Sequence, residues 1–112
     1  MNSSDSACGG YSIVLATAGT RRLAEEIARK LVEEKLAACV QIHRTKSFYR
    51  WNGAVRSGGE YLFIIKTKSQ LFDAISEFIG AHHDYQTPEV IRIAVQGGDG
   101  KYLHWIDDCL SP

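Results

Sequence analysis

Apolar and polar positions along the chain follow first a strand-like and then a helix-like pattern. Residues 11–17 form a near-continuous apolar run, which is typical of a central strand covered on both faces. From Thr20, a suitable N-cap, to about Lys35, apolar and small residues recur at the spacing of a helix with one buried stripe. The residues of that stripe are Leu23, Ala24, Ile27, Ala28 and Leu31.

The middle of the chain has the pattern of a long β-hairpin. Its strands, 38–51 and 54–68, are joined by Asn52-Gly53, a dipeptide that favours a type I′ turn because both positions there have positive φ. Gly58-Gly59 predicts a β-bulge in the second strand, and a bulge would shift the pairing by one residue. In the register of a simple two-residue loop, Val40 and Ile42 oppose Ile65 and Phe63.

The last third of the chain repeats the order of helix and strand. A helical pattern covers residues 69–81, a short alternating strand covers 89–96, and a final helix follows Asp99, a suitable N-cap. The order βαββαβ with a terminal helix predicts an α+β fold, a ferredoxin-like sandwich whose antiparallel sheet has helices on one face and a bare second face. We expect residues 11–112 to form this single domain, after a disordered tail of residues 1–10 rich in Ser and Gly.

The hairpin is too long for the body of such a domain. A strand of about 14 residues spans about 45 Å, whereas a domain of this size has a diameter of roughly 35 Å. The tip therefore protrudes, and it carries Phe48, Tyr49 and Trp51. Aromatic side chains exposed on a projecting ribbon are typical of a protein interface, which predicts a small symmetric oligomer.

Composition limits the choice of partners. The 112 residues carry 13 Lys+Arg and 13 Asp+Glu, and this balance provides no field that attracts nucleic acid or an anionic membrane. No apolar run reaches the roughly 20 residues of a membrane span, and residues 1–10 lack the basic start and apolar stretch of a signal peptide.

The three scattered cysteines do not form a disulfide framework, which favours a reducing compartment. We therefore expect a cytoplasmic protein without nucleic-acid or membrane partners.

The segment His82–Glu89 places two imidazoles, a phenol and two carboxylates where regular structure ends. His82 and His83 are the first candidate metal ligands, because neutral imidazole suits Cu(II), Ni(II) and Zn(II). Adjacent residues on a helix point about 100° apart, so both can bind one ion only if the helix unwinds there. Alternatively, the two histidines satisfy carbonyl groups at the end of a helix and interact favourably with its dipole.

Five segments, in order, resemble motifs of the CutA divalent-cation tolerance proteins. They are Leu36-Ala-Ala-Cys-Val-Gln-Ile42, Ser47-Phe-Tyr-Arg-Trp-Asn-Gly53, the stretch from Glu60 to Lys66-Thr67, His82-His-Asp-Tyr-Gln-Thr-Pro-Glu89 and Tyr102-Leu-His-Trp105. The resemblance covers about residues 11–110. It implies a cytoplasmic, ferredoxin-like homotrimer similar in architecture to PII-type signalling proteins. It also implies a role in the tolerance of copper and other divalent metals.

The chain departs from the family pattern at two positions. Ala16 stands where some bacterial members have a cysteine that is offered as a copper ligand, and the missing thiolate argues against a Cu(I)-selective site. Asp84 stands where the motif after the histidine pair usually has proline. Its carboxylate either adds an oxygen ligand or closes a turn.

A second candidate site is a cleft between subunits. Its predicted lining consists of Trp51, Glu60, Lys66, Tyr85 and Glu89. A charged pair near aromatic walls suits a small polar ligand. Alternatively, Lys66 forms an interface salt bridge with Glu60 or Glu89 while the aromatic residues pack the trimer. The further aromatic residues expected at the interface are Phe48, Tyr49 and Trp105.

Two weaker patterns concern anions. Arg21 and Arg22 open the first helix, where they could hold an anion together with free backbone N–H groups, or simply be solvated. Gly97-Gly98-Asp99-Gly100 matches neither the dinucleotide nor the Walker pattern, and Asp99 as N-cap explains it better.

The motifs favour a binding protein over an enzyme. The sequence has no nucleophile-elbow or HExxH motif and no obvious acid–base pair beyond Glu60 and Glu89, so we expect neither catalysis nor an organic cofactor. RNA binding is disfavoured because residues 60–65 lack the basic-Gly start of the RNP1 pattern. The leading hypothesis is a homotrimer that binds divalent metal ions, copper included, for metal tolerance. The alternative is a PII-like small-ligand sensor or an assembly scaffold that binds at the intersubunit cleft.

Overall fold

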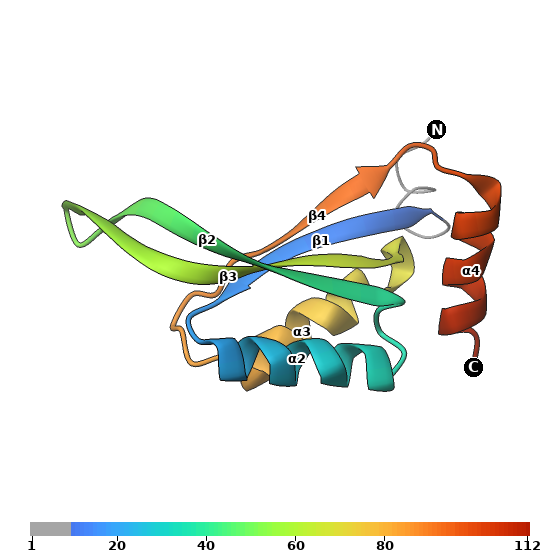
Figure 1. Cartoon of the computed structure of the whole chain (residues 1–112), viewed down its shortest axis with the longest axis horizontal. Coiled ribbons are helices and arrows are strands. Elements are labelled where there is room, and N and C mark those ends of the chain that lie inside the picture. Colours follow the sequence, from blue (N-terminus) through green and yellow to red (C-terminus); the bar gives the residue numbers. More distant parts are fainter. Residues whose placement is uncertain (1–9) are drawn as a thin grey trace.

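The computed structural model describes residues 10–112, and the predicted tail lies outside the described residues except for Gly10. The elements are β1 (Tyr11–Ala18), α2 (Arg21–Glu33), β2 (Cys39–Trp51), β3 (Ala54–Lys68), the 3-10 turn η1 (Ser69–Leu71), α3 (Phe72–His82), β4 (Val90–Val95) and α4 (Gly100–Leu110). The strands form one antiparallel sheet in the order β2-β3-β1-β4 (Figure 1). The α+β fold and the predicted order of elements are confirmed.

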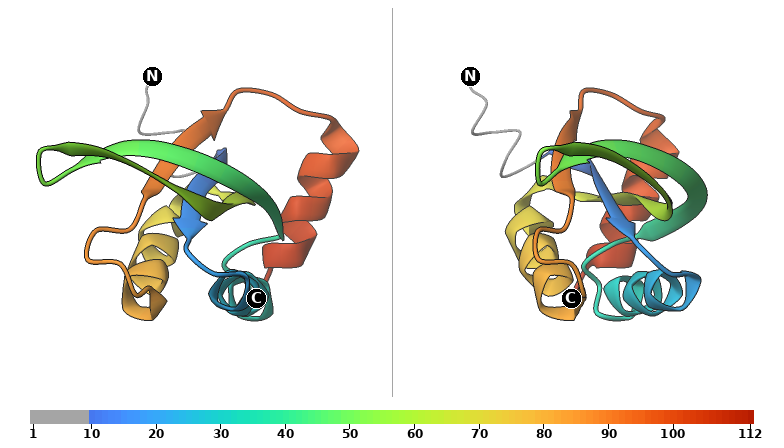
Figure 2. Two further views of the ribbon diagram at one scale, coloured as in Figure 1. Left: turned by 60° about the vertical axis from the view of Figure 1, so that its left-hand side comes forward. Right: turned by 90° about the vertical axis from the view of Figure 1, so that its left-hand side faces the viewer.

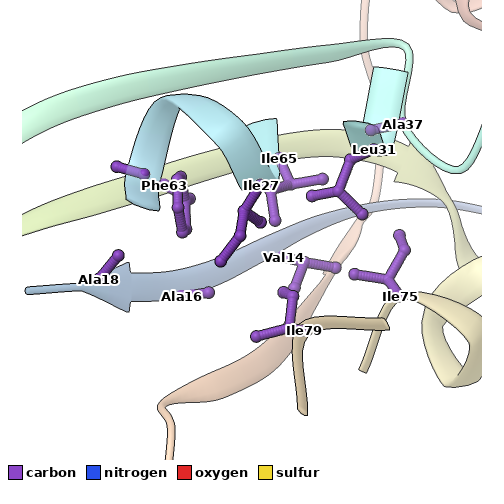
Figure 3. Close-up of a cluster of buried hydrophobic side chains, with 11 residues drawn as sticks. Val14, Ala16, Ala18, Ile27, Leu31, Ala37, Phe63, Ile65, Ile75 and Ile79 are labelled. Carbon is purple, nitrogen blue, oxygen red and sulfur yellow. The ribbon is translucent and has the colours of Figure 1, made fainter. Parts of the chain in front are cut away.

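The hydrophobic core lies between the sheet and helices α2 and α3, which lie side by side beneath one face (Figures 1 and 2). Every second residue of β1 points into this layer, together with the predicted stripe of α2. Each Val, Leu, Ile or Phe side chain fully buried here contributes about 1.5–3 kcal/mol, so this layer holds the helices on the sheet. The buried cluster, most of it labelled in Figure 3, consists of Val14, Ala16, Ala18, Ala24, Ile27, Leu31, Ala37, Phe63, Ile65, Ile75 and Ile79.

The opposite face of the sheet carries apolar residues that the single chain covers only in part. Ile13 pairs with Ile93, and Leu15 pairs with Ile91, so these four side chains share this face. Ile91 and Ile93 are 51% and 46% exposed, while Ile13 and Leu15 are half-buried. The bare second face is therefore as predicted. The apolar run of β1 predicted that both faces of this strand are covered. Within residues 10–112, the second face is only partly covered.

The long hairpin of β2 and β3 projects well beyond the helices (Figure 1). Asn52 and Gly53 have φ of 51° and 77°, as a type I′ turn requires. The simple register is confirmed, with Val40 opposite Ile65 and every residue of β2 paired in turn. The predicted bulge is wrong, because Gly58 and Gly59 pair with Ser47 and Lys46 in an unbroken ladder that leaves no extra residue on either strand.

The helix caps follow local sequence chemistry. The Thr20 hydroxyl accepts a hydrogen bond from the Leu23 N–H at 3.2 Å, and the Asp99 carboxylate accepts one from the Tyr102 N–H at 3.1 Å. Both predicted N-caps are thus confirmed. The first helix ends at Glu33, slightly earlier than predicted, and the following turn places Lys35 at a φ of 58°. This left-handed residue ends the helix and turns the chain toward β2.

The terminal helix α4 packs at the end of the sheet away from the hairpin tip (Figure 1). The Tyr11 hydroxyl donates a hydrogen bond to Asp107 at 2.7 Å, and Lys68 Nζ lies 3.2 Å from the same carboxylate. The hydrogen bond from Tyr11, together with Lys68, lowers the pKa of Asp107 below its ordinary value. No helix in residues 10–112 is long and apolar enough to cross a membrane.

Candidate functional site

A groove of about 780 Å³ lies between the outer part of the hairpin and the loop that joins α3 to β4. We call it the hairpin groove. Figure 1 shows this loop beneath the point where the hairpin leaves the body of the domain. The residues that line the groove are Thr17, Ser47, Phe48, Tyr49, Trp51, Arg56, Glu60, Asp84, Tyr85, Gln86, Thr87 and Glu89.

His83 fixes the loop to the end of β1. Its side chain is 0% exposed, its Nε2 lies 2.6 Å from the carbonyl oxygen of Thr17, and its Nδ1 accepts a hydrogen bond from the Tyr85 N–H at 3.0 Å. These partners require a neutral imidazole with its proton on Nε2, which donates to the carbonyl. Both ring nitrogens are therefore engaged, and neither presents a lone pair to a metal ion in this conformation.

His82 has different partners from His83. Its Nδ1 lies 2.9 Å from the carbonyl oxygen of Phe78, one turn earlier in α3, and its ring stacks on the Phe78 ring with centroids 4.0 Å apart. The exposed imidazole therefore carries its proton on Nδ1, which leaves the Nε2 lone pair available. The structure does not bring His82 and His83 to a common point. Residues 10–112 contain no group of three His, Cys, Asp or Glu that could hold one metal ion.

A hydrogen-bonded chain of three side chains joins the two walls of the groove. The Tyr85 hydroxyl donates to Glu60 Oε2 at 3.0 Å, and the Ser47 hydroxyl donates to Glu60 Oε1 at 2.7 Å. Burial is the main cause that raises the pKa of Tyr85 to about 12, followed by the hydrogen bond to Glu60 and the negative charges nearby. The phenol therefore stays neutral and keeps donating to Glu60 over the whole physiological range.

Two residues predicted for the site lie elsewhere in the chain. Lys66 is six residues beyond Glu60 on β3, or about 20 Å along the strand, and its Nζ lies 5.8 Å from the centroid of the Tyr102 ring of α4. Trp105 stacks on the same Tyr102 ring at 5.5 Å and is half-exposed. Within one chain, Trp51 and Tyr85 therefore share the groove with carboxylates but without Lys66.

Arg21 is paired at the start of α2. Its Nε lies 3.3 Å from Glu25 one turn later, and both side chains are well exposed. This pairing favours the simpler interpretation of a solvated side chain over an anion site.

The comparison with protein families gives one clear result. The family model described as CutA1 divalent ion tolerance protein matches residues 12–109, nearly the whole described chain. The chain belongs to this family. The resemblance inferred from five sequence motifs is thereby confirmed for the CutA1 family.

Individual relatives agree with the CutA1 assignment. The chain is 42% identical, over 84% of its length, to "Protein CutA, chloroplastic" from Arabidopsis thaliana. It spans about half the length of that and the next curated relatives, for example 52% of the Arabidopsis protein. Among solved structures, the periplasmic divalent cation tolerance protein CutA from Archaeoglobus fulgidus matches with a TM-score of 0.88 and 37% identity, covering 90% of this chain and 99% of that one. CutA1 from Oryza sativa matches with a TM-score of 0.88 and 37% identity, covering 95% and 98%.

The site of this CutA1 chain depends on residues that sequence reasoning missed. The carbonyl oxygen of Thr17 accepts a hydrogen bond from His83, and Arg56 adds a cationic side chain to the groove lining. Gly19 permits the close approach of Tyr85, because a Cβ at this position would lie 2.8 Å from the Tyr85 hydroxyl oxygen. A glycine after an apolar strand does indicate a tight approach or a turn, but it does not name the partner.

Replacing Tyr85 with phenylalanine is expected to remove one late step from the alkaline titration of the protein. The phenol has its ordinary pKa of 10.0 in the unfolded chain and about 12 in the folded chain, so its stabilising contribution is present below pH 10 and is lost as the pH rises through 12. Phenolate absorbance of wild type minus Tyr85→Phe measures this step directly. A difference curve centred near pH 10 would contradict the position assigned to Tyr85.

Proposed function

We propose that this chain acts in divalent-cation tolerance as a homotrimer that binds divalent metal ions, Cu(II) among them, through His82. The family assignment supports the general role, since relatives carry names such as "Divalent-cation tolerance protein CutA". The observation that carries the metal contact is the exposed imidazole of His82, whose tautomer is fixed by the Phe78 carbonyl. A histidine that donates from one ring nitrogen to a carbonyl is the usual form of a metal-binding histidine.

Among the described residues 10–112, the donors fit Cu(II) or Zn(II) better than Cu(I). Ala16 supplies no thiolate at the end of β1, and Cys39 and Cys109 are partly buried on β2 and α4. One imidazole per chain is a borderline ligand that suits divalent copper, nickel and zinc. Asp84 follows in sequence and offers an exposed carboxylate, which favours the same harder ions.

Calorimetric titration of Cu(II) tests the role of His82. The His82→Ala variant is expected to weaken binding at least about tenfold, equivalent to about 1.4 kcal/mol. His104→Ala is the matched control, because His104 is also an exposed helical histidine beside a carboxylate, Asp108, at 3.7 Å. Equal losses in both variants, or unchanged binding in His82→Ala, would contradict the proposed contact.

The trimer is the assembly that the family resemblance implies, and two surfaces support an oligomer. One is the half-covered apolar face formed by Ile13, Leu15, Ile91 and Ile93. The other is the hairpin tip, where Phe48 is 70% exposed. Exposed apolar patches next to aromatic residues are typical of protein interfaces.

A second candidate function, binding of a small ligand in a PII-like sensor or scaffold, is favoured by the hairpin groove. Its volume of about 780 Å³ lies within the range of small-molecule sites, and aromatic side chains form much of its wall. A ligand of this groove should raise the midpoint of thermal unfolding of wild type but not of Trp51→Ala. Ligands that stabilise both proteins equally would place binding outside the groove.

The cytoplasmic location remains a prediction from the three scattered cysteines. The names of relatives give different compartments, because the Arabidopsis protein is called chloroplastic and the Archaeoglobus protein periplasmic. Fractionation of the cells that produce this chain would decide between them.

A further inference from the structure

We propose that Arg92 binds a phosphate group, either as inorganic phosphate or as part of a small ester, on the helix-covered side of the sheet. The site is built from contacts within one chain, and it lies on neither of the two surfaces proposed for assembly, the open sheet face and the hairpin tip. It is also separate from the hairpin groove and from His82, so the inference goes beyond the proposed function and does not depend on it.

Arg92 points away from the open face of the sheet. It pairs across β1 and β4 with Val14, a residue of the buried core, and residues that pair directly share one face of a sheet. Its neighbours Ile91 and Ile93 alternate with it and lie on the open face, where we expect the subunit contact. The side chain of Arg92 therefore lies on the side where α2 and α3 pack (Figure 2), and an assembly through the open face does not cover it.

Two buried hydroxyl groups orient the guanidinium group of Arg92. Its Nη1 donates to Ser12 Oγ at 3.1 Å and to Ser69 Oγ at 3.4 Å, and these two oxygens lie 2.6 Å apart. Ser12 and Ser69 are 1% and 5% exposed, so packing fixes their positions. Both hydrogens of Nη1 are thereby used, which leaves the edge of the guanidinium plane formed by Nε–H and Nη2–H.

This remaining edge of Arg92 has no carboxylate partner among residues 10–112. The ion pairs of these residues join other side chains, and Asp73, the acidic residue in the first turn of α3, is exposed. Two parallel N–H groups on one guanidinium edge match two oxygens of a phosphate group or a carboxylate. Arg92 is half-buried, so an oxyanion held there would be less screened than at a fully exposed arginine.

A further donor favours phosphate over a carboxylate. Ser12 and Ser69 carry two hydroxyl hydrogens, of which the bond between them uses one, and the other has no acceptor within residues 10–112. A buried donor without an acceptor is costly. A third oxygen of a phosphate group would accept it, whereas a carboxylate has only the two oxygens that Arg92 holds. The start of α3, three residues after Ser69, has no side-chain cap, and its dipole favours a negative charge at this end.

Three probes test the ligand class in the full-length, assembled protein: inorganic phosphate, phenyl phosphate and benzoate. Each is titrated at neutral pH, with sodium chloride holding the ionic strength constant. Calorimetry measures the affinity, and the NMR signal of the Arg92 Nε–H group reports the location. Phenyl phosphate is expected to bind at least about fivefold more tightly than benzoate. If inorganic phosphate binds more tightly than phenyl phosphate, the ligand is free phosphate, and the reverse order assigns an ester. Equal or tighter binding of benzoate would overturn the phosphate assignment.

Variants separate the guanidinium contact from a general effect of positive charge. Arg92→Lys keeps the charge but removes the paired donors, so it should weaken binding of phenyl phosphate at least about tenfold. Ser69→Ala removes one of the hydroxyl groups that orient Arg92 and should weaken it at least about threefold. Arg22→Lys is the matched control, because Arg22 is an exposed arginine in the first turn of another helix, α2, and should leave binding unchanged.

Two results would overturn the proposal. One is equal weakening by Arg92→Lys and Arg22→Lys, which would indicate a diffuse attraction of anions to the surface. The other is the absence of binding of both phosphate probes to the wild-type protein. Neither result bears on the metal contact at His82 or on the hairpin groove, which have their own tests.

Discussion

Replacing His83 with alanine is expected to lower the free energy of unfolding by about 2–4 kcal/mol. The buried imidazole donates to the Thr17 carbonyl and accepts from the Tyr85 N–H, so its removal leaves both backbone groups without their partner and opens a cavity. A buried polar group that loses its partner costs about 1–3 kcal/mol. Urea denaturation at one fixed protein concentration measures the loss, because oligomerisation makes apparent stability depend on concentration.

The neighbouring histidine provides the matched control. His82 is exposed, and its hydrogen bond and ring stacking are both with Phe78 of its own helix, so His82→Ala should change the free energy of unfolding by no more than about 0.5 kcal/mol. His83→Phe separates the two causes of the His83 effect, since it fills the cavity but restores neither hydrogen bond. Equal losses in His82→Ala and His83→Ala would mean that His83 does not hold the loop.

Much of the fold follows from short-range pattern. The stripe of Ile27 and Leu31 at helical spacing and the Asn52-Gly53 turn depend on residues close in sequence, so their structures could be predicted from sequence alone. Thr20 and Asp99 were predictable as caps for the same reason. Gly58-Gly59 misled the prediction, because a glycine pair permits a bulge but does not require one.

The site was less predictable because its contacts join distant parts of the chain. His83 meets a carbonyl 66 residues earlier, and a carbonyl group leaves no signature in sequence. Trp51, Glu60 and Tyr85 were expected in a cleft between subunits, which stays a prediction, and within one chain they line the same groove. Lys66 was expected with them in a cleft between subunits; within one chain it lies at the far end of β3, with its Nζ 5.8 Å from the centroid of the Tyr102 ring of α4.

Replacing Ile93 with aspartate is expected to convert the proposed trimer into monomers at micromolar concentration. Ile93 lies on the half-covered sheet face and is 46% exposed in the single chain. If this face is buried between subunits, each interface would enclose an unpaired carboxylate at a cost of about 2–5 kcal/mol, which weakens association about 30-fold or more. Light scattering coupled to size-exclusion chromatography measures the mass of each species.

Val32→Asp is the control that separates a specific interface from a general effect of surface charge. Val32 is 42% exposed, nearly the same fraction as Ile93, but it lies on α2, which covers the other side of the sheet. An aspartate there stays in water and should leave the trimer intact. Loss of assembly in Ile93→Asp alone would place the subunit contact on the open sheet face, beside the hairpin groove. Assembly and ligand binding would then be coupled through β3 and β4. Dissociation of both variants, or of neither, would remove this face from the interface and leave the hairpin tip as the remaining candidate.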